Sequence, residues 1–426
     1  MSHRLLTSLL CCLPLIGATV LCCAPLVGAT LPKAAPEEVG ISAQRLQRVS
    51  ALAKRYIDQG EIAGAVTLVA RKGRLAHLEA QGVMDLDTKQ PMKTDSIFRL
   101  ASMTKPITSL AIMMLHEEGR FLLNDPISKW LPEFKLMQVA LANAPNERAA
   151  TGFRTIPAER EITFRHLLTH TAGLASGTGG PTLEASKALA KLRNPENTMA
   201  EYVTALAKLP LNFQPGTAWE YGPGTDVLGR LVEVISGQSL DQFFRERIFT
   251  PLAMNDTHFY LPDAQLPRLT AAYEKKDGKL SKLTAPGVAA RNGKFYMGAG
   301  GLAGTAEDYL RFCQMLLNGG VLDGKRLVSR KTIELMTANH IGRIPMWQET
   351  LQGYRFGLGF RVREHTGESA LLGSNGSYGW GGAYGTFFWV DPKEQMIGII
   401  MIQLMPYAHL NLRPEFQNAA TQAIVD

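Results

Sequence analysis

Hydrophobic side chains follow two different spacings in the first part of the chain beyond position 36. Over Ser42–Tyr56 they recur at the spacing that predicts an amphipathic helix. Ala63–Ala70 is rich in strand-forming residues, Arg71–Gly73 can form a turn, and Leu75–Gly82 continues in the same way. A β-hairpin is therefore expected directly after the helix.

The middle of the chain has a helical pattern. Leu100–Glu118 is apolar enough to predict a buried helix, which ends at Gly119. From about 120 to 290 helical segments alternate with loops rich in proline and glycine. Thr225–Ile235 is the clearest of these helices, and Gly237 follows it as an end signal.

Strand-like patterns return near the C-terminus. Strands are expected at Tyr354–Arg363, Ala383–Val390 and Gln395–Gln403. The last two flank Asp391–Glu394, a sequence typical of a turn. They therefore resemble a second hairpin, far along the chain from the first.

These patterns together predict an α+β fold. The N-terminal hairpin and the C-terminal strands would share one antiparallel sheet flanked by helices. This α/β lobe would comprise about 36–118 and 290–426, with a mostly helical lobe of about 119–289 inserted between them. No repeat or low-complexity tract divides the chain, so residues 30–426 are expected to form one catalytic unit.

Residues 1–29 differ from the rest. Arg4 precedes the apolar stretch Leu5–Val27, and Val27-Gly28-Ala29 offers small residues for a signal-peptidase cut. The segment is predicted to be a cleaved signal peptide, which makes the mature protein periplasmic or secreted. An uncleaved anchor is the alternative, because the apolar run is long enough to cross a bilayer.

Composition excludes several classes of protein. Hydrophobic residues make up 46% and charged residues 19% of the 426 positions, which supports a large core and argues against disorder. The net charge of +7 comes without a basic stripe, so no nucleic-acid partner is expected. No stable membrane partner is expected beyond export. Cys313 lies outside the signal segment in an apolar stretch, which favours core packing over a catalytic thiol.

Two other catalytic or metal-binding patterns are absent or incomplete. No serine lies in a G-x-S-x-G, which excludes the nucleophile elbow of α/β-hydrolases. His166 and His170 have an i, i+4 spacing, but no glutamate stands between them and no third ligand is indicated. Capping or packing is therefore expected for both histidines, and no metal site is expected.

Ser102 and Lys105 form an S-x-x-K motif at the start of the predicted buried helix. Residues i and i+3 share one helix face, so the hydroxyl and the amine meet. The helix N-terminus favours negative charge on the serine oxygen and on a bound oxyanion. A lysine acts as a base where burial or nearby positive charge favours the neutral amine. The motif alone is weak, because it also occurs by chance.

Five segments in order along the chain strengthen the motif. They are Arg99–Thr108 (RLASMTKPIT), His166–Leu174 (HLLTHTAGL), Pro215–Gly229 (PGTAWEYGPGTDVLG), Gly298–Phe312 (GAGGLAGTAEDYLRF) and Gly379–Pro392 (GWGGAYGTFFWVDP). With them the chain, over roughly 36–410, resembles the serine β-lactamase-like hydrolases related to class C β-lactamases and DD-peptidases. It looks most similar to their esterase branch, the family VIII carboxylesterases. The resemblance implies the β-lactamase/transpeptidase-like fold.

The resemblance implies catalytic roles for three side chains. Ser102 matches the family's nucleophile, Lys105 its base partner and Tyr221 its catalytic tyrosine. A phenol in this place can exchange a proton with the serine and with the leaving group. The other interpretation of Tyr221 is a buried aromatic residue beside Trp219.

The triplet Trp380-Gly381-Gly382 stands where lactamases carry Lys-Thr-Gly. By the same resemblance the triplet binds substrate, and the backbone N–H groups of Ser102 and Ala383 form the oxyanion hole. A tetrahedral oxyanion needs two such preorganised donors, and glycines let substrate approach the strand closely. His365-Thr366-Gly367 is a rival for this motif, although it has the pattern of a hairpin turn.

Two departures from the lactamase pattern bear on the substrate. Pro223 stands where lactamases have an asparagine, and Trp380 replaces the lysine of Lys-Thr-Gly. Both remove polar groups that grip the amide and carboxylate of a β-lactam, whereas tryptophan offers apolar surface. Neutral esters with apolar parts are therefore expected rather than anionic lactams.

We expect a serine hydrolase that cleaves carboxylic esters of small molecules through an acyl-enzyme on Ser102. The mechanism requires no metal or organic cofactor. Hydrolysis of β-lactams or D-alanyl peptides in the same site is the first alternative. A penicillin-binding sensor without turnover and an acyltransferase remain open as well, and the oligomeric state is undetermined.

Overall fold

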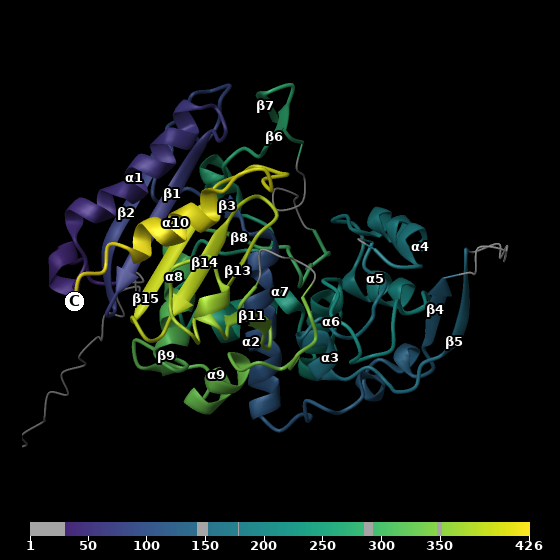
Figure 1. The fold of residues 1–426 in the computed structure, drawn as a ribbon. Coiled ribbons are helices and arrows are strands. Elements are labelled where there is room, and N and C mark those ends of the chain that lie inside the picture. Colours follow the sequence, from purple (N-terminus) through teal and green to yellow (C-terminus); the bar gives the residue numbers. More distant parts are fainter. Residues whose placement is uncertain (1–29, 143–151, 178, 285–292, 347–351) are drawn as a thin grey trace, which may run out of the picture.

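A computed structural model describes most of the chain (Figure 1). The described residues are 30–142, 152–177, 179–284, 293–346 and 352–426. The predicted signal peptide at 1–29 lies outside them, so its cleavage stays a prediction. In the part that is described, no helix is long and apolar enough to cross a membrane.

One antiparallel sheet of seven strands forms the centre of the α/β lobe, as the sequence predicted. Its order is β11-β12-β13-β14-β15-β1-β2, so the N-terminal hairpin pairs with the last strand of the chain, with Leu68 opposite Ile399. The strands are β1 (Gly64–Arg71), β2 (Arg74–Gly82), β11 (Tyr354–Phe356), β12 (Arg361–Arg363), β13 (Tyr378–Gly381), β14 (Phe387–Asp391) and β15 (Met396–Met401). Both ends of the chain thus build the platform that carries the site.

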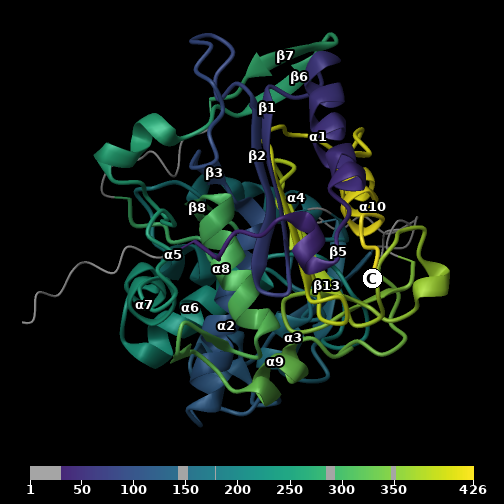
Figure 2. The same ribbon diagram turned by 90° about the vertical axis from the view of Figure 1, so that its left-hand side faces the viewer.

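Helices cover both faces of this sheet (Figure 2). They are α1 (Ala43–Asp58), α10 (Leu412–Thr421), α8 (Ala306–Leu317) and α2 (Thr104–Glu117). α1 and α10 pack together on one face, where Val69, Trp389 and Phe416 share a buried cluster. α8 contacts β1, β14 and β15 from the other face. Because alternate side chains of a strand point to opposite faces, two covered faces require strands that are apolar on both, as β15 is along its length and β14 is up to Asp391.

The helical lobe is arranged around α6, which packs against α2, α3, α5 and α7. Its helices are α3 (Phe164–Leu168), α4 (Leu183–Lys187), α5 (Met199–Leu206), α6 (Gly224–Ser236) and α7 (Leu240–Phe244). Gly237 ends α6 in the left-handed conformation, as its position predicted. Because α2 contacts α6, the turn that precedes α2 lies between the two lobes.

Shorter elements connect these parts. They are β3 (Phe98–Arg99), β4 (Gln138–Ala142), β5 (Phe153–Pro157), β6 (Tyr273–Lys276), β7 (Lys279–Lys282), β8 (Ala303–Gly304), β9 (Val321–Leu322), β10 (Lys325–Arg326) and α9 (Arg330–Met336). β3 pairs with β8 directly before the turn at Ser102. The β6–β7 hairpin lies beside the sheet, since Tyr273 donates its backbone N–H to Gln403 (2.9 Å) and packs in the same cluster as Trp389. The border between the lobes near 289 stays a prediction.

Two strand predictions were wrong in detail. Tyr354–Arg363 is not one strand, because the chain turns at Gly357–Phe360 and β11 pairs back onto β12; Gly359 has φ +96° there. Ala383–Val390 is not one strand either. Gly382–Thr386 forms a turn, so Trp380 and Gly381 end β13 and the next strand begins only at Phe387.

A glycine on β15 makes room for the largest side chain of the neighbouring strand. Gly398 lies directly opposite Trp389, and a methyl group on Gly398 would overlap the indole ring. We expect Gly398→Ala to lower the free energy of unfolding by about 1–3 kcal/mol, because the ring must leave its packed position. Urea-induced unfolding followed by tryptophan fluorescence measures the change.

Gly367→Ala is the matched control, since Gly367 is exposed and a methyl group there meets no atom within 4 Å. Its effect should stay within about 0.5 kcal/mol. Equal unfolding midpoints for the two variants would contradict this account of β14 and β15.

Candidate active site

Ser102 lies in a short 3-10 turn, Ala101–Met103, which leads directly into α2. The buried helix predicted from Leu100 therefore begins as α-helix only at Thr104. Ala101 has φ +46°, a left-handed conformation that a residue other than glycine adopts at a cost. Neighbouring elements hold this turn, since Leu100 donates its N–H to the Leu302 carbonyl (2.9 Å) and Tyr309 donates its hydroxyl to the Met103 carbonyl (2.9 Å).

Lys105 lies one turn further, on the same face as Ser102. Its Nζ is 3.3 Å from Ser102 Oγ and donates to the carbonyl of Ala299 at 2.8 Å. The side chain is only 5% exposed, and Nζ lies over the ring of Tyr221, 4.6 Å from its centroid. The predicted meeting of hydroxyl and amine is thus present in the structure, with the amine enclosed.

The carbonyl of Ala299 is itself held from the helical lobe. Ala299 donates its N–H to Asp226 Oδ1 at 2.9 Å, and Asp226 forms an ion pair with Arg193 at 3.4 Å. Asp226 is fully buried near the start of α6. Buried carboxylates persist where hydrogen bonds and an opposite charge compensate them. The same segment therefore carries Tyr221 and fixes the group that binds Lys105.

Tyr221 faces the site from the loop before α6. Its hydroxyl accepts a hydrogen bond from Trp380 Nε1 at 3.4 Å, and the two rings are 5.4 Å apart. The ring of His170 packs against the Tyr221 ring, with the ring centroids 4.8 Å apart. These contacts join the loop after α3, the Tyr221 loop and β13 around one phenol, so Tyr221 lies at the boundary of both lobes and lines the cavity.

His170 is buried beside this cluster in a left-handed conformation, with φ +58°. Burial, together with the positive charge of Lys105, lowers its pKa to about 3. Among the described residues its Nδ1 has no hydrogen-bond partner. His170 is therefore a packing residue that is neutral at neutral pH, in agreement with the packing role expected from the sequence.

The second predicted oxyanion donor, Ala383, lies in the turn between β13 and β14. Gly382 donates its N–H to the Thr386 carbonyl at 2.8 Å, which closes the turn and leaves Ala383 exposed. A side chain on Gly382 would overlap the Leu100 carbonyl and Thr386 Oγ1. Only glycine therefore allows this turn to lie against the residue two positions before Ser102.

Arg413 of α10 supports the same turn. Its guanidinium donates to the carbonyls of Gly382, Gly385 (3.2 Å) and Thr386 (2.6 Å), and to the hydroxyl of Tyr407. One planar cation thus binds three carbonyls of the turn, in addition to the hydrogen bond that the turn makes itself. Burial lowers the pKa of Arg413 to about 10, so it stays charged at neutral pH.

A cavity of about 530 Å³ opens in front of these groups. Its lining includes six residues that the sequence singled out, Ser102, Tyr221, Trp380, Gly381, Gly382 and Ala383. Lys105 does not line the cavity and lies behind Ser102. A volume of this size suits a small organic substrate, and apolar rings and side chains such as Trp219, Phe387 and Leu410 form much of its wall.

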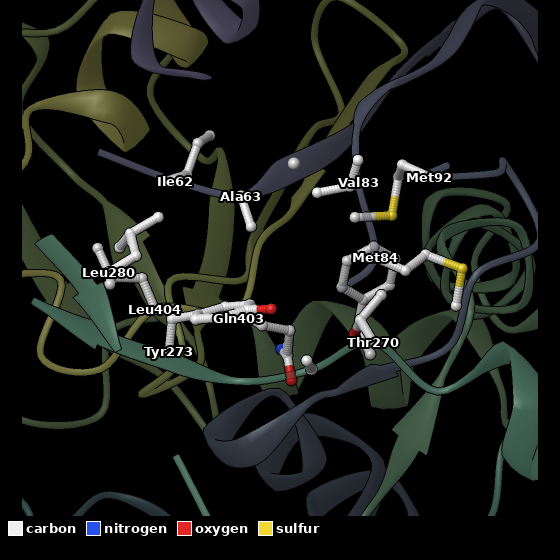
Figure 3. Close-up of a pocket in the computed structure, with 13 residues that line it drawn as sticks. Ile62, Ala63, Val83, Met84, Met92, Thr270, Tyr273, Leu280, Gln403 and Leu404 are labelled. Atoms are coloured by element: carbon white, nitrogen blue, oxygen red, sulfur yellow. The ribbon is translucent and has the colours of Figure 1, made fainter. Parts of the chain in front are cut away.

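A second hollow lies between the start of β1 and the β6–β7 hairpin (Figure 3). Met84, Met92, Tyr273 and Leu404 are among its walls, and its volume is about 10 Å³. That space holds no more than one water molecule. It is a packing gap that takes no substrate.

Other residues considered from the sequence lie elsewhere. His365-Thr366-Gly367 is an exposed turn after β12 that does not line the cavity. His166 caps α3, where its Nδ1 accepts the N–H of Thr163 at 3.2 Å, as predicted. Cys313 is buried in the core, and burial raises its pKa far above the usual value, as packing predicts. The described residues contain no cluster of three or more His, Cys, Asp or Glu side chains able to hold a metal ion.

Four residues around the site were missed from the sequence, namely Ala299, Asp226, Arg413 and Arg361. Ala299 and Asp226 lie in two of the quoted segments, and Asp226 carried a signal as a lone acid at the start of an apolar helix. Arg413 and Arg361 carried none, because nothing local shows that α10 and β12 meet the Trp380 strand.

Comparisons with known proteins identify the family of the chain. The sequence model of the family described as Beta-lactamase matches residues 49–422. The chain is 37% identical over 368 residues to Protein Rv1367c of Mycobacterium tuberculosis, which covers 83% of this chain and 88% of that one. It is 30% identical over 375 residues to Esterase EstB of Burkholderia gladioli, with 82% and 88% covered. The solved structure of "EstCE1, a hydrolase with promiscuous acyltransferase activity" matches with a TM-score of 0.75 at 28% identity, covering 90% of this chain and 99% of that one.

The fold and the match define the class as serine hydrolases of the β-lactamase/transpeptidase-like fold, which confirms the fold class and the enzyme class expected from the sequence. The chain belongs to the Beta-lactamase family.

The turn that carries Ala383 is expected to be essential for rate. In Gly382→Ala the new methyl group pushes the turn away from Leu100 and so moves the Ala383 N–H. Loss of one oxyanion donor typically lowers kcat by about 100- to 1000-fold, and we expect a fall of this size for turnover of p-nitrophenyl butyrate. Gly367→Ala, far from the cavity, should keep the wild-type kcat; a wild-type kcat in Gly382→Ala would exclude Ala383 as a donor.

His170 makes stability depend on pH with a defined sign. Its pKa is about 3 in the folded protein against 6.5 for the free side chain, so the unfolded chain binds more protons between these values. The free energy of unfolding should therefore fall as pH drops below about 6.5, with His170 contributing about 2 kcal/mol between about pH 7 and pH 5. Urea unfolding at the two pH values measures this loss.

His170→Asn removes the titration and tolerates the left-handed conformation. We expect it to lose less stability than the wild type between the two pH values. His365→Asn, at an exposed position, is the control and should lose as much as the wild type. Equal losses in all three proteins would show that His170 is not held neutral by burial.

Proposed function

We propose that the protein is a serine hydrolase that cleaves carboxylic esters through an acyl-enzyme on Ser102. The observation that carries the proposal is the position of Lys105 Nζ, 3.3 Å from Ser102 Oγ and enclosed behind it. A serine hydroxyl is a weak nucleophile unless an adjacent base accepts its proton. The cavity in front of Ser102 leaves space for an ester on the side away from Lys105.

Acylation follows from these positions. Ser102 Oγ attacks the ester carbonyl and its proton passes to Lys105 Nζ, while the carbonyl oxygen becomes an oxyanion held by the N–H groups of Ser102 and Ala383. When the ester C–O bond breaks, the leaving alkoxide takes a proton from Lys105 or Tyr221. The products are the acyl-Ser102 ester and a free alcohol.

Deacylation repeats these steps with water as the nucleophile. A water molecule attacks the acyl carbonyl, its proton passes to the Lys105 and Tyr221 pair, and Ser102 Oγ leaves with a proton returned from that pair. Tyr221 takes part as the acid or base on the cavity side, where its hydroxyl accepts from Trp380. Ala299 holds Nζ at the same place throughout both halves.

Small-molecule esters are the proposed substrates. Trp380 fills the position of the lactamase lysine and presents an apolar ring to the cavity together with Trp219 and Phe387. Similarity to Esterase EstB supports ester cleavage. No metal and no organic cofactor is used in the proposed steps.

Three alternatives share the same site. β-Lactam or D-alanyl peptide hydrolysis would need the same nucleophile, and acyl transfer would need only an alcohol that reaches acyl-Ser102 before water does; EstCE1 is described as a hydrolase with promiscuous acyltransferase activity. A sensor that binds penicillin without turnover would acylate and stop. Export to the periplasm or the medium is proposed from the predicted signal segment alone.

Removal of either proposed catalytic side chain should abolish ester turnover without unfolding the chain. We expect Ser102→Ala to lower kcat for p-nitrophenyl butyrate by about 10⁴-fold or more and Lys105→Ala to do nearly the same, because nucleophile and base act as one unit. Steady-state release of p-nitrophenol measures the rates. Lys208→Ala, at an exposed lysine, is the matched control and should keep the wild-type rate.

The substrate class is decided by a direct comparison. The wild type should turn over p-nitrophenyl butyrate far faster than a chromogenic cephalosporin. Fast cephalosporin hydrolysis with negligible ester turnover would favour a lactamase instead. Stable acylation that never clears, seen by intact-mass spectrometry with every ester tried, would favour the sensor.

A further inference from the structure

The cavity beside Ser102 is lined by two arginines, Arg361 and Arg413, whereas no aspartate or glutamate is part of the lining that the structure describes. A positive charge withdrawn from water is unfavourable unless an anion or hydrogen bonds compensate it. The positive charge of each guanidinium must therefore be compensated by groups of its own.

Arg413 is satisfied by the protein itself. Its donors are directed to the carbonyls of Gly382, Gly385 and Thr386 and to the hydroxyl of Tyr407. Its function is to hold the turn that carries Ala383. Few of its N–H groups remain for a ligand, so Arg413 contributes charge to the cavity but is not the group that binds there.

Arg361, unlike Arg413, is not held by hydrogen bonds within the part of the chain that the structure describes. It lies on β12 opposite Gly379 of β13, one strand away from the Trp380 motif. Its guanidinium lies over the rings of Tyr354 (4.8 Å) and Phe387 (5.0 Å). Within the described part of the chain it has no hydrogen-bond or ion-pair partner, although it is only partly exposed.

Contact with aromatic rings leaves the N–H groups of a guanidinium free to donate hydrogen bonds. Cation–π contacts engage the faces of the planar group, whereas hydrogen bonds are made by the N–H groups at its edge. Tyr354 and Phe387 contact the Arg361 guanidinium through their rings, and neither accepts a hydrogen bond from its N–H groups in the described structure. A planar edge of this kind matches the two oxygens of a carboxylate.

Arg363, two residues after Arg361 on β12, adds a further positive charge, and the cavity lining that the structure describes contains no aspartate or glutamate to balance it. Arg363 is 1% exposed and donates to the hydroxyl of Tyr354 and to the carbonyl of Leu371 (2.9 Å). Burial acts to raise the pKa of Tyr354, yet that pKa lies below its usual value because Arg361 and Arg363 favour the phenolate. Three guanidiniums thus lie on one side of the Trp380 strand.

We propose that Arg361 is the anion-binding residue of the substrate cavity and that the preferred substrates are esters with a carboxylate on a second carbon chain, such as half-esters of dicarboxylic acids or esters of hydroxy acids. This inference rests on the proposed ester hydrolysis at Ser102. It revises the expectation of neutral esters. Trp380 replaces the lysine of the lactamase motif, but Arg361 on the neighbouring strand β12 brings a positive charge to the same cavity.

Two matched ester pairs test the proposal. p-Nitrophenyl hemisuccinate and its methyl ester differ by a charge on the acyl side, and 4-acetoxybenzoate and its methyl ester differ by a charge on the alcohol side. For the wild type we expect the charged member to have the higher kcat/KM in at least one pair, which also shows on which side the carboxylate binds. In Arg361→Met the charged-to-neutral ratio of kcat/KM in that pair should fall about 10- to 100-fold.

Because a ratio is measured, a loss of folded protein in the variant cancels. Arg361→Lys keeps the charge but not the planar edge, so its ratio should fall between the wild type and Arg361→Met. Arg355→Met is the matched control, since Arg355 lies on the neighbouring β11, pairs with Glu364 (3.4 Å) and does not line the cavity. Its ratio should equal that of the wild type.

Two results would overturn the subsite while leaving ester hydrolysis in place. One is a wild-type ratio below one in both pairs, with Ser102-dependent turnover of the neutral esters. The other is an unchanged ratio in Arg361→Met. Failure to turn over any of the four esters would overturn both the subsite and the proposed function.

Discussion

The proposed site depends above all on where the Lys105 amine is held. Nζ lies between the Ser102 hydroxyl and the Ala299 carbonyl and over the Tyr221 ring, and the Lys105 side chain is almost completely buried. Each of these neighbours comes from a different segment. The Asp226–Ala299 hydrogen bond connects the helical lobe to the α/β lobe at this point. The junction of the lobes is thus also the place where proton transfer is proposed.

The sheet provides the opposite wall. Its strand order places β13 next to β14, so the turn between them faces the residues before α2, and Gly382 allows the approach. Arg413 then holds the turn from the far side of the sheet through backbone carbonyls. Because the donors on Ser102 and Ala383 are backbone groups, their direction is set by these supports, and electrostatic stabilisation requires such preorganisation.

Much of this arrangement could be predicted from local sequence. Helical spacing, a turn signal and the S-x-x-K motif gave the first hairpin, the helix at Ser102 and the meeting of Ser102 with Lys105. The remainder depends on which strands become neighbours. Tyr354–Arg363 looked continuous because its apolar pattern runs through the turn at Gly359. Nothing local indicated a role for Arg361 or Arg413, because only tertiary packing brings β12 and α10 to the cavity.

The most direct test of the central claim is covalent labelling with a fluorophosphonate, followed by peptide mapping. The reagent reports an activated serine without reference to any substrate. The account predicts one adduct, on Ser102, and much slower labelling once Lys105 is replaced by alanine. An adduct on another serine, or a labelling rate that does not change when Lys105 is replaced, would contradict it.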